Sequence, residues 1–170
     1  MKKLLTTAFA AVFMVVCFAG CASSHQESYE GISFEVPNNW EDISDEAQKS
    51  DVMDAYYCYT FDNGGAEITF TDPSKLYFTL DDRAETSAEV LNANGEDRYS
   101  FQRVDSDTKD GYTYDYAKET FETNKGTRYA MVYRVEAPGK PVALFSVYSY
   151  DDFPRDEIWA IQDSIKVSNK

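Results

Sequence analysis

The stretch that decides the fold runs from residue 111 to residue 150 and reads GYTYDYAKETFETNKGTRYAMVYRVEAPGKPVALFSVYSY. Apolar and aromatic residues alternate in it with polar ones, and the turn sequences NKG and APGKP interrupt the alternation twice. Alternation is typical of half-buried strands, and short turns join neighbouring antiparallel strands. The stretch predicts three strands, Gly111–Phe121, Thr127–Ala137 and Val142–Tyr150, and a fourth, Tyr99–Asp105, precedes them across the turn KDG.

Further strands are predicted on the N-terminal side of this meander. GISFEVP (31–37) alternates apolar and polar residues until a proline ends it. YYCYTF (56–61) and AEITF (66–70) flank DNGG, whose Asn-Gly pair suits the positive φ angles of a tight hairpin turn. Residues 44–53 have the composition of a short helix.

Two longer helices are predicted. Thr79 can cap the first, with Asp82 three residues later, and its apolar stripe consists of Leu80, Ala84, Ala88 and Leu91. Pro154 suits the first turn of the second helix, which places three isoleucines on one face: Ile158, Ile161 and Ile165. The predicted fold class is α+β, with an antiparallel sheet of about six or seven strands covered by helices.

Two segments resemble the PsbP-like α/β/α sandwich proteins. In GISFEVPNNW (31–40) a strand ends in proline and a tryptophan follows, and IWAIQDSIKVS (158–168) is similar to the final helix of that family. The order of elements agrees over roughly residues 29–168. The family includes a photosystem II extrinsic protein, a Ran-GTPase-binding import factor and many bacterial lipoproteins. The resemblance implies a binding or accessory module, without shared catalytic residues.

The N-terminus has the pattern of a secretory signal peptide. Lys2 and Lys3 precede an uncharged run over 4–18, which is shorter than the ~20 apolar residues that span a bilayer. The run ends in FAGC, which resembles the lipobox of bacterial lipoproteins. There, diacylglycerol is attached to the cysteine, here Cys21, and cleavage follows Gly20. A transmembrane helix, or a secreted protein cleaved elsewhere, is the alternative.

This interpretation divides the chain into a signal peptide (1–20), the lipidated Cys21 with a short polar linker (21–28), and one globular domain (29–170). Only Cys58 then remains in the domain, where we interpret it as a buried, inert strand residue. His25 is interpreted as a solvated linker residue. Loss of two lysines with the signal changes the formal net charge from −14 to −16, which disfavours nucleic acid as a partner.

No recognised catalytic, metal or cofactor motif is present in the sequence. DSDTKDG (105–111) superficially resembles a calcium loop, but its positions 5, 6 and 12 are Lys109, Asp110 and Tyr116 instead of the required residues. We interpret it as a solvated hairpin tip. The pairs Asp81-Asp82 and Asp151-Asp152 fit helix starts. No cofactor and no metal site are predicted, and weak cation binding by distant acids is left open.

Tyrosines alternate along two predicted strands. They offer flat rings with polar tips that could contact a ligand or a protein, so they form a candidate binding face: Tyr112, Tyr114, Tyr116, Tyr148 and Tyr150. The alternative, which we favour, is that these rings pack beneath the helices. Trp40 and Trp159 are also assigned to the core.

The sequence predicts a lipid-anchored protein on the extracytoplasmic face of a bacterial membrane. Its leading functional hypothesis is a non-catalytic binding or accessory module for another envelope protein. The first alternative is a lipoprotein that binds a small ligand, namely a sugar, a peptide or a cation. A hydrolase that uses carboxylates is a remote third possibility.

Overall fold

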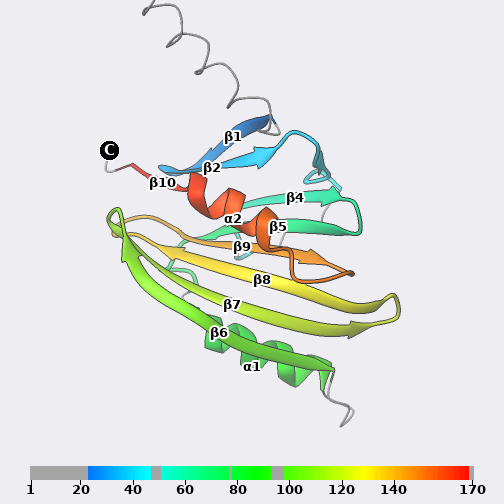
Figure 1. Cartoon of the computed structure of the whole chain (residues 1–170). Helices are drawn as coiled ribbons and strands as arrows, with labels where there is room; N and C mark the ends of the chain where they lie inside the picture. Colours follow the sequence, from blue (N-terminus) through cyan, green and yellow to red (C-terminus); the bar gives the residue numbers. More distant parts are fainter. Residues whose placement is uncertain (1–22, 47–50, 77, 93–97, 169–170) are drawn as a thin grey trace, which may run out of the picture.

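A seven-stranded antiparallel sheet forms the middle layer of the chain (Figure 1). The structure, a computed structural model, describes residues 23–46, 51–76, 78–92 and 98–168. The large sheet contains, in spatial order, β3 (Glu41–Asp42), β4 (Ala55–Phe61), β5 (Gly64–Thr71), β9 (Val142–Ser149), β8 (Gly126–Glu136), β7 (Tyr112–Thr123) and β6 (Tyr99–Lys109). A smaller sheet contains β1 (Ser24–Tyr29), β2 (Ile32–Pro37) and β10 (Lys166–Val167). The predicted α+β class is confirmed.

The predicted meander is confirmed as β6, β7, β8 and β9, which pair antiparallel in chain order. The first turn is shorter than expected. Residues 105–109, assigned to a hairpin tip, continue β6, because Asp110 and Gly111 alone make the turn, with φ angles of 49° and 87°. The hairpin of β4 and β5 also turns over two residues, and Asn63 takes a φ of 55° there.

Both long helices form where they were predicted. Thr79 and Asp82 make a capping box at the start of α1 (Leu80–Leu91), and Leu80 is fully buried. α2 (Arg155–Ser164) follows Pro154 and buries Ile158 and Ile161. A short helix over 44–53 was wrong for its described parts, because residues 44–46 and 51–52 lie in turns; residues 47–50 lie outside the described residues.

The N-terminal linker is the main correction to the predicted organisation. Residues 24–28 belong to β1, which pairs with β2 from Ser24 opposite Pro37 to Tyr29 opposite Ile32. Backbone pairing orders this polar segment, although its composition gives no strand signal. His25 is therefore a strand residue, with its Nδ1 2.9 Å from Asn38 Oδ1. Cys21 and the signal peptide lie outside the described residues.

The two helices cover opposite faces of the large sheet (Figure 1). α2 and the small sheet enclose the larger core cluster, which includes Phe34, Phe70 and Phe145. Trp40 belongs to that core, as predicted. Trp159 does not: it is 47% exposed, because Ile158 and Ile161 occupy the inward positions of α2 and the adjacent residue points outward.

Candidate functional site

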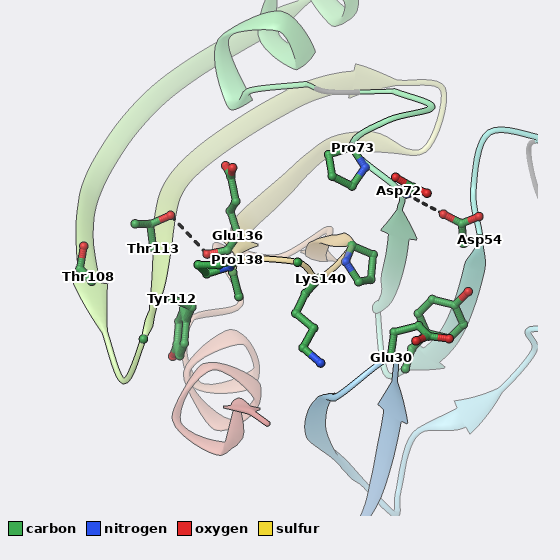
Figure 2. A pocket seen from close by; sticks show the side chains of 15 residues that line it. Glu30, Asp54, Asp72, Pro73, Thr108, Tyr112, Thr113, Glu136, Pro138 and Lys140 are labelled. Atoms are coloured by element: carbon green, nitrogen blue, oxygen red, sulfur yellow. Dashed lines mark hydrogen bonds between the residues drawn. The ribbon is translucent and has the colours of Figure 1, made fainter. Parts of the chain in front are cut away.

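A cleft of about 850 Å³ lies at one end of the large sheet. At this end β5 and β8 finish and β7 and β9 begin, and the connection between β1 and β2 approaches from the small sheet. Figure 2 shows Glu30, Asp54 and Asp72 on one side of the cleft and Thr113 and Glu136 on the other, with Lys140 between them. The cleft thus brings together residues from five separate connections.

One wall is a hydrogen-bonded group of acids. Asp54 accepts a hydrogen bond from the backbone N–H of Asp72 at 2.6 Å and pairs with Lys75. Asp72 in turn accepts from the backbone N–H of Ser74 at 2.8 Å, and the hydrogen bonds from Ser74 hold the pKa of Asp72 below its ordinary value. The hydrogen bond to Asp54 raises the pKa of Lys75. The Asp72 carboxylate and the Lys75 ammonium group are therefore charged at neutral pH.

The opposite wall combines an acid with an aromatic ring. Arg134 donates to Glu136 Oε2 at 2.7 Å, and the Thr113 hydroxyl donates to the backbone carbonyl of Glu136 at 3.4 Å. The Tyr112 ring is 1% exposed and lines the cleft from the start of β7. The guanidinium group thus fixes the position of the Glu136 carboxylate.

The connection between β8 and β9 forms the third side. Pro138 and Pro141 restrict its backbone, and Gly139 takes a φ of 69°. Lys140 extends to the turn between β1 and β2: a Cβ built on Gly31 would lie 2.6 Å from Lys140 Nζ. Glycine at position 31 is therefore favoured by its positive φ of 85°, whereas the end of the flexible Lys140 side chain can move aside.

The five candidate tyrosines do not form one surface. Tyr112 and Tyr116 are buried in the same cluster as Phe145 and Val147 of β9. Since neighbouring strand residues point to opposite faces, Tyr148 lies on the other side of the sheet.

Two of the remaining tyrosines are half-buried among specific partners. The Tyr114 ring stacks on Tyr133 at 5.1 Å, and Tyr148 packs under the Arg128 guanidinium, 3.6 Å from the ring centre, and against Tyr150. Of the five candidates, only Tyr112 lines the cleft. Alternation within a strand predicted that the tyrosines of each strand lie on one face, but not which face of the sheet that is.

Sequence reasoning missed the cleft residues Glu30, Asp54, Asp72 and Lys140. Each belongs to a connection rather than to a strand interior. β5 and β8 both pair antiparallel with β9, so the charged residues that follow these two strands lie at the same end of the sheet. The sequence analysis did not predict the pairing of β5 with β9, so it could not bring these residues together.

Metal-ligand clusters and membrane-spanning helices are both absent from the described residues. No group of three or more His, Cys, Asp or Glu side chains is arranged to hold a metal ion in the part of the chain that the structure describes. Among those same residues, no helix is long and apolar enough to cross a membrane. Cys58 is buried and free, and burial raises the pKa of its thiol, so it is not an activated nucleophile.

Comparison with known proteins bears on the fold. No protein-family model and no curated protein matches the chain. The solution structure of cyanobacterial PsbP (CyanoP) from Synechocystis superposes with a TM-score of 0.56 at 15% identity, over 89% of this chain and 96% of that one. The Ran-binding protein Mog1p of Saccharomyces cerevisiae superposes with a TM-score of 0.51 at 12% identity, over 86% and 96%. The chain therefore has a PsbP-like fold, as the sequence predicted.

Proposed function

We propose that this chain is a lipoprotein held on the extracytoplasmic face of a bacterial membrane, where it acts as a non-catalytic binding module for an envelope protein. The observation that carries the proposal is FAGC at residues 18–21, placed directly before the folded domain. A diacylglyceryl group on Cys21 supplies at least two acyl chains, which is what stable anchoring takes. The fold supports a binding role, since the Ran-binding protein Mog1p has a similar fold.

The position of the first strand gives this module an orientation. Only two residues separate Cys21 from β1, which starts at Ser24. β1 then extends for about 17 Å, at roughly 3.3 Å per residue, and ends at Tyr29, which lines the cleft. With lipid on Cys21, the anchor would precede the first residue of β1, whereas the cleft lies at its last residue. We therefore expect the cleft to face away from the lipid surface.

Crosslinking on intact membranes tests the proposal. A crosslinker with one lysine-reactive end and one non-selective photoreactive end would be applied to cells that express the native chain, with mass spectrometry as the readout and Cys21→Ser as the control. Lys75 and Lys140 lie at the cleft, whereas Lys125 is exposed in the turn between β7 and β8 at the other end of the sheet. We expect one dominant envelope partner, crosslinked through Lys75 or Lys140 and lost in Cys21→Ser.

Two results would contradict the proposal. Unchanged membrane retention of Cys21→Ser would refute the lipid anchor. Partner crosslinks confined to Lys125 would refute the cleft as the binding site.

The size of the cleft favours a second candidate function, in which the chain binds a small ligand. A volume of about 850 Å³ lies within the usual range for small-molecule sites. A thermal-shift screen of sugars and short peptides on the mature protein, with Gly139→Glu to obstruct the cleft, would test it. A stabilising compound that no longer acts on Gly139→Glu would support this alternative.

A further inference from the structure

We propose that the cleft binds its partner through an extended protein segment that places a lysine or arginine side chain against Glu30 and Asp72. This inference rests on the proposed function and names the chemistry of the segment that the cleft accepts. It follows from the charges of the two walls, from the apolar residues between them, and from the volume of the cleft.

The charges that line the cleft are unbalanced. Glu30, Asp54, Asp72 and Glu136 contribute four carboxylates, and Lys140 contributes an ammonium group. Asp54 is paired with Lys75 and Glu136 with Arg134. Glu30 and Asp72 form no ion pair with any residue that the structure describes. Two carboxylates on one side of the cleft are therefore available to a cation (Figure 2).

The residues between these charges are apolar and rigid. Pro73, Pro138 and Pro141 border the cleft, and Tyr29 also lines it, together with Tyr112, which is almost wholly buried. The Tyr29 ring packs on Phe70, with 5.2 Å between ring centres, so its position is held by the core. Ordered apolar surface beside carboxylates suits the methylene stem and charged end of lysine or arginine.

The nature of the cation follows from two further observations. The described residues contain no group of three or more metal-ligating side chains, which disfavours a bare metal ion here. A cleft of about 850 Å³ is larger than one side chain fills, so it also has room for backbone on both sides of the cation. The net charge of the mature domain also attracts basic partners and repels acidic ones.

Fluorescence anisotropy with defined probes tests this inference. The mature lipidated protein in non-ionic detergent would be titrated into fluorescein-labelled tri-arginine and into the same peptide built from neutral citrulline. The test variant is Glu30→Gln with Asp72→Asn, which removes two charges and keeps side-chain size. The matched control is Glu85→Gln with Glu89→Gln, two exposed positions of α1 with the same loss of charge.

We expect tri-arginine to bind about tenfold more tightly than tri-citrulline, and the test variant to lose most of that difference. The control variant should change the affinity less than about twofold, because neither of its two positions lines the cleft. Equal melting temperatures of the two variants would show that neither has lost its fold.

Several outcomes would overturn the inference. Equal weakening by both variants would mean diffuse attraction to an acidic surface, and equal binding of tri-citrulline would mean that charge is not recognised. Argininamide binding as tightly as tri-arginine would mean a small cation instead of an extended segment. A partner crosslinked at the cleft through a segment without lysine or arginine would refute this inference while leaving the proposed function intact.

Discussion

The two faces of the large sheet are built from different chemistry. On the face beneath α2 and the small sheet, aromatic and aliphatic side chains form the larger core, in which Phe34 and Phe145 meet edge to face at 5.2 Å. On the α1 face, the buried cluster consists of Leu80, Ala117, Val132 and Leu144. Beside that small cluster, a side-chain ion pair attaches α1 to the sheet: Arg83 donates to both carboxylate oxygens of Glu119, each at 3.0 Å.

The two helices are therefore held against the large sheet by different kinds of interaction. α2 is held by non-directional burial, which scales with the apolar area removed from water. α1 depends on directional contacts, because each donor and acceptor in its buried network must be paired or it costs free energy. We therefore expect the α2 face to dominate global stability, and the α1 face to be more sensitive to single polar changes than its apolar area suggests.

Adjacent residues of β9 allow the sharpest test of this comparison, because Phe145 points to the α2 face and Leu144 to the α1 face. Phe145→Ala removes a fully buried ring and should lower the free energy of unfolding by about 3–5 kcal/mol. Leu144→Ala should lower it by about 2 kcal/mol, since its cluster is small and can partly collapse. Urea unfolding, followed by the fluorescence of buried Trp40, measures both. A larger loss for Leu144→Ala would break the comparison.

The ion pair on the α1 face gives the second test. Glu119 is 1% exposed and accepts hydrogen bonds from Arg83 and from the Tyr99 hydroxyl. Arg83→Met leaves a buried carboxylate without its cation and should lower the free energy of unfolding by about 3 kcal/mol.

Replacing both partners separates the strength of the pair from the cost of an unpaired charge. The double variant Arg83→Met with Glu119→Met should recover most of the lost stability, because no buried charge is left alone. Chemical unfolding of the two single variants and the double variant completes the thermodynamic cycle. A double variant less stable than Arg83→Met would show that α1 needs these ions for more than mutual neutralisation.

The sequence predicted the parts of the fold that rest on local signals. Short alternating patterns predict the meander, and the spacing of Thr79 and Asp82 predicts the helix cap. Both are confirmed. β1 was missed because its residues are polar and its order comes from pairing with β2, which composition does not encode. The cleft was missed for a related reason: Glu30 and Asp72 are 42 positions apart, and only tertiary packing places both of them at the cleft. Lipidation of Cys21 stays a prediction.

Removing one buried tyrosine hydroxyl from each face of the sheet gives the third test. The Tyr99 hydroxyl donates to Glu119 Oε1 at 2.9 Å, so Tyr99→Phe should lower the free energy of unfolding by about 2 kcal/mol. The buried Tyr59 hydroxyl, on the α2 face, has no hydrogen-bond partner among the described residues. Tyr59→Phe should therefore be neutral or stabilise the protein by up to about 1 kcal/mol. Losses of equal size in urea unfolding would refute the contrast between the faces.

The smallest expected effect is at the start of α1. Asp82 accepts hydrogen bonds from the Thr79 backbone N–H and hydroxyl, each at 2.8 Å, and these hold its pKa below the ordinary value of 3.8. A lowered folded-state pKa stabilises the fold above the unfolded-state pKa, and this stabilisation is lost as the pH falls through the folded-state value. Asp82→Asn should therefore be slightly less stable than the native chain at pH 7, with the difference shrinking below about pH 4. Glu85→Gln, on the same helix, controls for charge alone. A difference between native and Asp82→Asn that stays constant from pH 7 to pH 3 would show that the cap contributes through shape and not through the ionised carboxylate.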